Sequence, residues 1–370
     1  MSIADSAILA VSSHFISQEP AVRLSESVMP AMPAMRLPAI ASHLIAMLGI
    51  ACVVPAVRAE IYQPPGDGVT TVTVGFYLLN LDLVDEKAKT FQADLYLEFS
   101  WQDDRMKHDG TTELLFADDA VGEQFETMWW PQVEFVNSGK PEFTNESLEI
   151  FPNGRVKYTI GLTGTFRASL DLRRFPFDRQ TLIVRLQSFL YDSSTLMFVP
   201  DDTTPGFEHD NTFEELRVTG VSAESRIAAL SGRSDRYSEY IASIRVVRNW
   251  TFYLWTVFGP VVLIFLIACA IFLVPIELFA DRVAICLTAL LACIATHFAI
   301  SFNLPHVGYL TVIDRLFVTT YGFAAVLVLV SGIELLLVHR HPTMRRRVNV
   351  VAAVSVPLGY LATVAMILLR

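Results

Sequence analysis

The stretch that decides the fold reads Ala168-Ser-Leu-Asp-Leu-Arg-Arg-Phe-Pro-Phe-Asp-Arg-Gln-Thr-Leu182. Pro176 stands between two aromatic residues, which predicts a tight turn with a peptide bond able to adopt the cis form. Phe175 and Phe177 provide apolar anchors for this turn, and the charge of Asp178 requires a partner. An ordinary aromatic-flanked turn is the alternative for a bare Phe-Pro-Phe.

Composition places the chain among membrane proteins. It has 370 residues, of which 52% are hydrophobic and only 18% charged, with a mean hydropathy of +0.43. Four uncharged runs are each long enough to cross roughly 30 Å of hydrocarbon as a helix. They are Trp250–Ile276, Val283–Leu304, Leu316–Ile333 with an extension past Glu334 to Val338, and Val348–Leu369. The formal net charge of -10 argues against nucleic-acid partners.

Residues 1–59 are interpreted as a leader. Arg36 precedes the apolar stretch Leu37–Pro55, and Val57-Arg-Ala59 offers small residues at a cleavage position. This pattern predicts a secretory signal peptide over about residues 36–59, with Glu60 as the first mature residue. An uncleaved membrane anchor is the alternative.

Cysteine usage agrees with an exported domain that folds without disulfides. Cys52 lies in the leader, and Cys269, Cys286 and Cys293 lie in hydrophobic runs. The positive-inside rule places the basic segment 339–347 in the cytoplasm. We therefore expect a multi-pass cell-membrane protein with four spans and its N-terminal domain outside, in the periplasm of a Gram-negative host.

Between residues 69 and 248 the pattern changes to short alternating segments separated by turn signals, which predicts a β-sandwich. Pro152-Asn-Gly154 lies between two such segments and predicts a hairpin turn. The clearest predicted strands are Thr71–Leu81, Phe91–Trp101, Arg155–Phe166, Thr181–Phe189 and Tyr240–Arg248.

Several motifs together resemble one known family. The stretch 168–182 is similar to the signature loop of the pentameric ligand-gated ion channels (the Cys-loop receptor superfamily), with Asp171 and Gln180 matching beside the Phe-Pro-Phe-Asp core. Ala168 and Leu182 occupy the two cysteine positions, a departure typical of bacterial members. Further matches in family order are Trp101-Gln-Asp-Asp-Arg105, Trp129-Trp-Pro131, Arg248 and Pro260.

The resemblance implies a complete architecture. It consists of an extracellular all-β sandwich followed by a four-helix transmembrane bundle, assembled as a pentamer around a central pore. The expected domains are the leader at 1–59, the ligand-binding sandwich at 60–248 and the pore domain at 249–370.

In this family the agonist lies between subunits in a box of aromatic rings, whose faces attract a cation. Position-by-position matching implies Phe189 and Tyr237 on the principal face and Tyr96 on the complementary face. Glu134 falls where amine-gated bacterial relatives carry a carboxylate, which would pair with an ammonium group. Tyr191, close to Phe189, completes the expected ligand-binding set.

Two departures from the family pattern concern this box. The segment 228–236 of the capping loop has no second aromatic residue, and Gln187 stands where those relatives have another acid. A packing role is therefore the alternative for Phe189 and Tyr96.

Helical spacing gathers one distinctive face on the second apolar run. Steps of three and four residues lead from an acid through small or hydroxyl residues to bulky apolar residues. The members of this face are Asp281, Ala284, Thr288, Leu291, Ala295, Phe298 or Ala299, and Phe302. Such a composition suits a channel lining better than a lipid-facing surface.

Repeated in five subunits, Asp281 forms an acidic ring that concentrates cations and repels anions. The pair Asp281-Arg282 resembles the acid and base of the family's cation channels, and a salt pair at the membrane edge is the alternative. Leu291 lies where relatives close the pore, and a ring of apolar side chains gates by dewetting. His297 is able to titrate near neutral pH, although a lone histidine in such a helix is more often hydrogen-bonded between helices.

A third set of residues is expected to couple the two domains. The resemblance places Glu86, Asp178 and Arg248 in a charge cluster at the membrane interface, where an arginine fork holds two carboxylates. Pro176 in the signature loop and Pro305 after the second span belong to the same set.

The sequence thus predicts a homopentameric, cation-selective channel opened by an extracellular amine-like ligand or by protons. A non-conducting, membrane-anchored β-sandwich receptor or adhesion module is the alternative. An enzyme, a cofactor and a resident metal are not expected, because the sequence has no Gly-x-Ser-x-Gly, His-Glu-x-x-His, Cys-x-x-Cys or phosphate-loop motif. The expected partners are the agonist, monovalent cations, the lipid bilayer and further copies of the chain.

Overall fold

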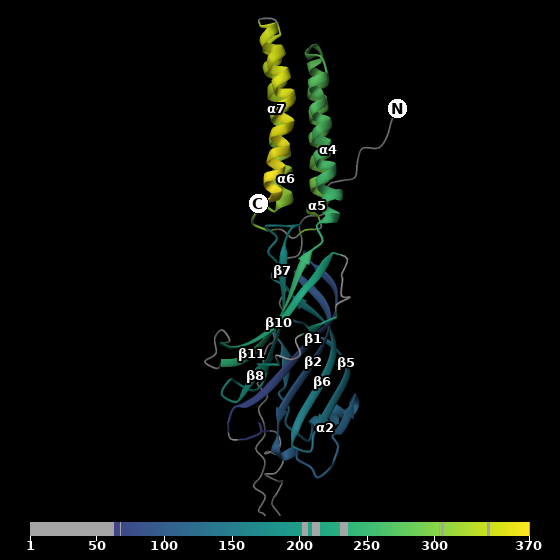
Figure 1. Cartoon of the computed structure of the whole chain (residues 1–370), viewed down its shortest axis with the longest axis vertical. Coiled ribbons are helices and arrows are strands. Elements are labelled where there is room, and N and C mark those ends of the chain that lie inside the picture. Colours follow the sequence, from purple (N-terminus) through teal and green to yellow (C-terminus); the bar gives the residue numbers. More distant parts are fainter. Residues whose placement is uncertain are drawn as a thin grey trace, which may run out of the picture. The chain divides into compact units, whose positions relative to one another are not determined.

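The computed structural model describes residues 63–66, 68–201, 206–208, 215–229, 236–302, 304, 307–338 and 341–369. The predicted leader, its cleavage site, the tip of the capping loop and Pro305 lie outside the described residues. Residues 56–370 form one compact unit. Within it, a region of β-strands precedes a region of long helices (Figure 1).

Two sheets make up the N-terminal region. The larger has the strand order β3-β5-β6-β2-β1-β8, with β9 paired to β1, and the smaller has the order β10-β11-β7-β4. The larger sheet contains β1 (Thr70–Asp85), β2 (Thr90–Gln102), β3 (Leu114–Ala117), β5 (Glu142–Ile150), β6 (Arg155–Arg167), β8 (Leu196–Pro200) and β9 (Gly206–Phe207). The smaller contains β4 (Val133–Phe135), β7 (Arg179–Ser188), β10 (Leu216–Ala229) and β11 (Arg236–Arg248). The short helices η1 (Asp104–Met106) and α2 (Asp119–Phe125) lie between strands.

Alternating burial explains why these segments form a sandwich. Every second side chain of β2 is buried from Phe91 to Trp101, as the two-residue period of a strand requires. Leu182, Val184 and Leu186 of β7 belong to the same core from the opposite sheet. The predicted β-sandwich is therefore confirmed.

The predicted hairpin is also present, between β5 and β6. Their paired residues run up to Ile150 and Val156. Gly154 closes the turn with φ of 82°, a left-handed conformation that glycine adopts without a steric penalty.

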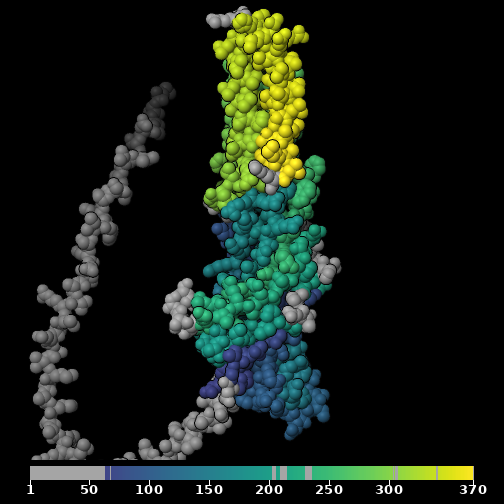
Figure 2. All heavy atoms as spheres, turned by 60° about the vertical axis from the view of Figure 1, so that its left-hand side comes forward, coloured from purple at the N-terminus to yellow at the C-terminus, as the bar shows by residue number. Residues whose placement is uncertain are grey.

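Four helices among the described residues are long and apolar enough to cross a membrane, as predicted. The first span, Thr251–Leu273, contains α3 (Thr251–Tyr253), the π-helical turn η2 (Leu254–Phe258), α4 (Gly259–Ala268) and the 3-10 turn η3 (Cys269–Leu273). The others are η4 (Ile276–Leu278) with α5 (Phe279–Ser301), α6 (Val312–Leu337) and α7 (Pro342–Leu369). The side chains of α6 and α7 pack side by side at the yellow end of the chain (Figure 2).

Three helix starts differ from the predicted runs. Helix α5 begins at Phe279, α6 at Val312 and α7 at Pro342, each several residues earlier than expected. Each predicted run began after the last charged residue. Backbone hydrogen bonding continues a helix through charged residues, so the helices begin earlier than these runs. The start of α6 is set by a capping box, in which Thr311 and Asp314 bond each other's backbone N–H groups.

The two phenylalanines of the signature loop pack into the helical region, whereas Leu182 at its end belongs to the core of the sandwich. Phe175 joins the second hydrophobic core, and its ring lies edge-on to Tyr253 with 5.0 Å between centroids. The Phe177 ring lies 5.7 Å from Trp250 and 5.9 Å from Phe258. The peptide bond before Pro176 is cis, as the sequence allowed. The two phenylalanines therefore anchor the loop on the start of the first span.

Candidate functional site

The first candidate site is a buried charge cluster where the last strand meets the first helix. Arg248 ends β11, and its Nε donates to Asp178 Oδ1 at 2.9 Å. Its Nη2 lies 2.8 Å from Glu86 Oε1, an ion pair without hydrogen-bond geometry, and 3.5 Å from Asp178 Oδ2. Gln180 Nε2 donates to Asp178 Oδ2 at 2.6 Å, and the Arg248 guanidinium lies 4.8 Å from the Phe175 ring centroid. The structure thus brings together the three charges predicted for coupling.

Burial and charge act in opposite directions on Arg248. Desolvation works to lower its pKa, but the adjoining carboxylates of Asp178 and Glu86 more than offset this, so the pKa is raised. The guanidinium therefore remains charged at every pH at which the protein functions.

Two further contacts connect the sandwich to the segment around the end of α5. Lys87 Nζ donates to the Phe302 carbonyl oxygen at 3.4 Å and lies 5.3 Å from the Phe302 ring centroid. The backbone N–H of Leu172 donates to Tyr309 Oη at 3.0 Å. The sequence does not predict these two contacts, because the partners of Lys87 and Leu172 are remote in sequence. Phe302, predicted as a pore residue, is thus also a contact of the loop after β1.

The second candidate site is the predicted pore face of α5. In the single chain all of its members are exposed: Asp281, Ala284, Thr288, Leu291, Ala295, Phe298, Ala299 and Phe302. Leu291 is 68% exposed and Phe298 is 73% exposed, so both side chains point away from the interior of the subunit. The opposite face is buried through Arg282, Cys286 and Cys293.

His297 lies between α5 and α6, as the simpler interpretation expected. Its Nδ1 is 3.0 Å from Tyr321 Oη, and its Nε2 is 3.1 Å from Asp314 Oδ1. Its ring stacks on Phe317 with 4.3 Å between centroids. Because Asp314 also caps α6, this histidine connects the middle of α5 to the first turn of α6.

The third candidate site is the predicted agonist face on the smaller sheet. A row of paired residues crosses the four strands: Glu134 on β4, Gln187 on β7, Glu239 on β11 and Arg226 on β10. Leu186 beside this row points into the core, so Gln187 and its neighbours point outward.

The predicted aromatic residues lie at one end of this row. Phe189 follows β7 directly and is 65% exposed, so its ring face is open. Tyr237 begins β11 but is only 7% exposed. The Tyr191 ring is half-buried at 5.6 Å from Trp129, and burial raises the pKa of Tyr191. Within one chain, Phe189 therefore offers the most accessible ring of the three.

Tyr96 lies on the other sheet, on β2. It pairs with Tyr77 of β1 and Gly161 of β6, and its ring covers Gly161 so closely that an added Cβ would lie 3.1 Å from Tyr96 Cε1. Tyr96 and Phe189 therefore belong to two different faces of one subunit. A shared ligand would have to lie between two subunits.

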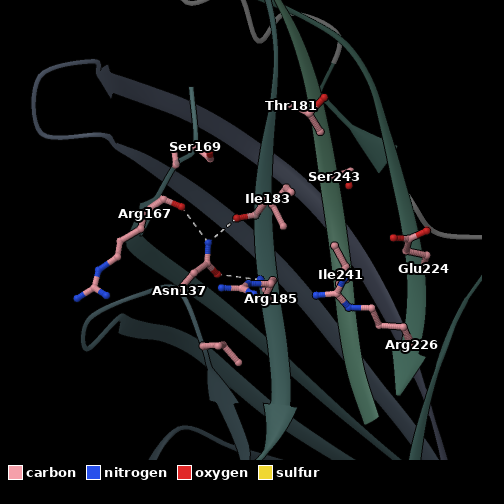
Figure 3. Close-up of a pocket in the computed structure, with 12 residues that line it drawn as sticks. Asn137, Arg167, Ser169, Thr181, Ile183, Arg185, Glu224, Arg226, Ile241 and Ser243 are labelled. Carbon is pink, nitrogen blue, oxygen red and sulfur yellow. Dashed lines mark hydrogen bonds between the residues drawn. The ribbon is translucent and has the colours of Figure 1, made fainter. Parts of the chain in front are cut away.

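A cavity of about 490 Å³ lies next to the row of paired residues (Figure 3). The buried carboxylate of Glu239 contacts Arg226 Nε at 2.7 Å and Arg185 Nη1 at 3.5 Å. The Asn137 side chain accepts from the Arg185 N–H at 2.9 Å and donates to the carbonyl oxygens of Arg167 and Ile183 at 3.1 and 2.6 Å. These bonds of Asn137 hold β7 in place. The carboxylate of Glu239 on β11 neutralises part of the positive charge of the arginines in the cavity wall.

Comparison with known proteins assigns the family. A family model described as the neurotransmitter-gated ion-channel ligand binding domain matches residues 60–251, more than half of the chain. The chain belongs to this family. The predicted resemblance to the pentameric ligand-gated ion channels is confirmed, and so is a multi-pass membrane protein with its N-terminal domain outside.

Individual relatives are similar along most of the chain. A proton-gated ion channel of Gloeobacter violaceus is 26% identical over 356 residues, which cover 92% of this chain and 94% of the relative. The gamma-aminobutyric acid receptor subunit beta-4 of Gallus gallus is 25% identical over 260 residues, covering 68% of this chain and 52% of the relative. The gamma-aminobutyric acid receptor subunit rho-2 of Homo sapiens is 24% identical over 257 residues, covering 67% of this chain and 54% of the relative. The chain thus spans nearly all of the first relative and about half of the other two.

One family motif packs in the core of the sandwich, as expected for its aromatic residues. In Trp101-Gln-Asp-Asp-Arg105, the fully buried Asp103 accepts from Arg105 Nε at 2.8 Å and from Arg105 Nη2 at 2.7 Å. Trp101 packs edge-on to Trp129 in the core, with 5.7 Å between centroids. This motif therefore helps to hold the sandwich together, and through Trp129 it borders Tyr191 of the third candidate site.

Proposed function

We propose that the chain forms a homopentameric, cation-selective channel that a small extracellular agonist opens by binding between subunits. The supporting observation is the exposed face of α5, on which an acid, small residues and a bulky apolar ring follow one another. Five such faces around an axis would give an acidic mouth and an apolar neck. An acidic ring attracts cations, and an apolar neck closes the pore by dewetting.

Two classes of agonist fit the site. An amine would place its charge against the open ring of Phe189, with Glu134 as the counter-charge. Protons are the second class, supported by the similarity to a proton-gated channel and by the contact of His297 with Asp314. The two classes are distinguished by a prediction in the Discussion.

A non-conducting receptor or adhesion module remains the competing function. Such a module would have no use for the exposed stripe of one acid and small residues that lies along α5. A planar-bilayer recording of the purified protein separates the two, because the module would give no unitary currents under any agonist.

The test of selectivity is the reversal potential when sodium chloride is diluted on one side. We expect the unmodified channel to reverse near the sodium potential, and Asp281→Ala to shift the reversal toward the chloride potential through loss of the acidic ring. Glu277→Ala is the matched control, because this acid points to Arg345 of α7 at 3.7 Å and lies outside the α5 face. Reversal of the unmodified channel near the chloride potential would contradict the proposal.

A further inference from the structure

Arg282 is the charged neighbour of Asp281, but it faces the interior of the subunit. Its side chain is 3% exposed, and its Nη1 donates to Glu334 Oε2 of α6 at 2.7 Å. The Glu334 side chain is 1% exposed. The Nε and Nη2 of Arg282 donate to the Val274 carbonyl oxygen, in the turn before α5, at 2.9 and 2.5 Å. One guanidinium thus joins three segments of the chain.

These bonds determine how α5 is rotated about its axis. Successive residues of an α-helix are about 100° apart around the axis, since a turn contains about 3.6 residues. When Arg282 is held inward by α6 and the turn, Asp281 is directed away from the subunit interior. Rotation of α5 that brought Asp281 inward would leave Glu334 as a buried charge without a partner, which is strongly unfavourable.

The remaining inward contacts of α5 are less directional. Cys286 and Cys293 lie on the same buried side as Arg282, and both pack in the second hydrophobic core. Apolar packing of small side chains tolerates modest rotation, whereas a guanidinium that donates both to Glu334 and to the Val274 carbonyl oxygen requires a defined orientation. The ion pair is therefore the specific constraint at this end of α5.

The charge of Arg282 is also compensated where it lies. Glu334 carries the opposite charge at 2.7 Å, so the pair together adds little net field at the mouth of the pore. Arg282 consequently does not oppose the field of Asp281, although the two residues are adjacent in sequence.

We propose that Arg282 and Glu334 are positioning residues for ion selectivity, which hold the Asp281 ring on the pore face without contacting the ion. This inference rests on the proposed cation-selective function. It differs from a through-space role, in which a positive charge beside the ring would reduce cation permeability directly.

The decisive variant is the neutral pair Arg282→Gln with Glu334→Gln. It removes both charges at once, leaves no buried ion unpaired, and leaves the net charge near the mouth unchanged. A through-space role predicts an unaltered reversal potential. The positioning role predicts a shift toward the chloride potential, in the same direction as Asp281→Ala.

Two comparisons make this measurement specific. Arg282→Lys keeps the ion pair with Glu334 and should retain most of the cation selectivity. Loss of selectivity in the neutral pair alone would then not be explained by general destabilisation. Arg345→Gln removes a positive charge at the same end of the helices without touching α5, and should leave the reversal potential unchanged. A wild-type reversal potential in the neutral pair would overturn the inference.

A second measurement does not depend on selectivity. The thiol of Asp281→Cys should react readily with a charged, water-soluble thiol reagent in nanodiscs, and slowly when the neutral pair is added. The unmodified chain is the baseline, because Cys286 and Cys293 are buried and Cys269 is partly buried. Equal reaction rates in the two backgrounds would overturn the positioning role. A chloride-selective unmodified channel with unequal rates would instead contradict only the proposed selectivity.

Discussion

At the scale of single residues, Asp178 shows how much depends on one buried carboxylate. It holds Arg248 through two contacts, and it receives the Gln180 amide. Removing its charge leaves the buried guanidinium with Glu86 as its remaining carboxylate. Through Arg248 this cluster joins the end of β11 to the signature loop and to the loop after β1.

We expect Asp178→Asn to lower stability by about 3 to 5 kcal/mol, the usual loss when a buried ion pair is broken from one side. Thermal unfolding of the detergent-solubilised protein measures this loss. Asp171→Asn is the control, since Asp171 pairs with Arg173 at the surface and such pairs contribute less than about 1 kcal/mol. Similar midpoints for the two variants would show that the buried cluster is not a stability determinant.

Phe189 decides between the two classes of agonist. If a cation lies against its ring, Phe189→Ala should weaken gating by about one to two kcal/mol, a roughly five- to thirtyfold shift in half-maximal concentration. Phe189→Tyr should shift it far less. If protons are the agonist, Phe189→Ala should leave the pH midpoint in place, while Glu134→Gln or His297→Phe moves it. Dose-response curves normalised to surface expression provide the measurement.

At the scale of an element, α5 carries two opposite faces with different purposes. The inward face is held by Arg282, the buried cysteines and His297. The outward face is exposed in the single chain, although Phe302 at its end contacts Lys87. Large exposed apolar side chains within a helix normally mark an interaction surface or a lining. Leu291 is the bulky apolar residue nearest the middle of that face.

Leu291→Ser should wet the neck of the pore and favour the open state, because a hydroxyl removes the dewetting barrier. We expect a higher basal current and a lower half-maximal agonist concentration, measured under voltage clamp. Leu336→Ser is the control, as an equally exposed leucine on α6 outside the predicted pore face. A closed channel that requires more agonist would show that Leu291 is not the gate.

At the scale of the whole molecule, the proposed agonist site would be formed by two subunits. Tyr96 belongs to the larger sheet and Phe189 to the smaller, on different faces of one chain. In a pentamer, the Phe189 face of one subunit would meet the Tyr96 face of the next. A site between subunits can be completed by two different variants in one pentamer, whereas a site within one subunit cannot.

Co-expression of Tyr96→Ala subunits with Phe189→Ala subunits should restore part of the agonist sensitivity that either variant loses alone. In mixed pentamers, some interfaces combine an intact Phe189 with an intact Tyr96. The measurement is the dose-response curve of the mixture against each variant expressed separately. A mixture no more sensitive than its components would exclude a shared interface.

The sequence alone was enough to predict the strands β1, β2, β6, β7 and β11, the four spans, the aromatic anchors of the signature loop and the composition of the α5 face. All of these depend on local periodicity, on the length of an apolar run or on a contiguous motif, and such signals are complete within a short segment. The helix starts were less accurate, because charged residues extend α5 and α7 beyond their uncharged runs.

Only the tertiary structure decided which side chains meet. It turned Arg282 inward to Glu334, seated Lys87 on Phe302, joined Leu172 to Tyr309 and buried Tyr237 while leaving Phe189 open. A buried charge takes the partner that long-range packing brings within a few ångströms, and packing brings together residues that sequence spacing keeps apart. The residue type therefore showed that a partner was needed, and the fold determined which partner it was.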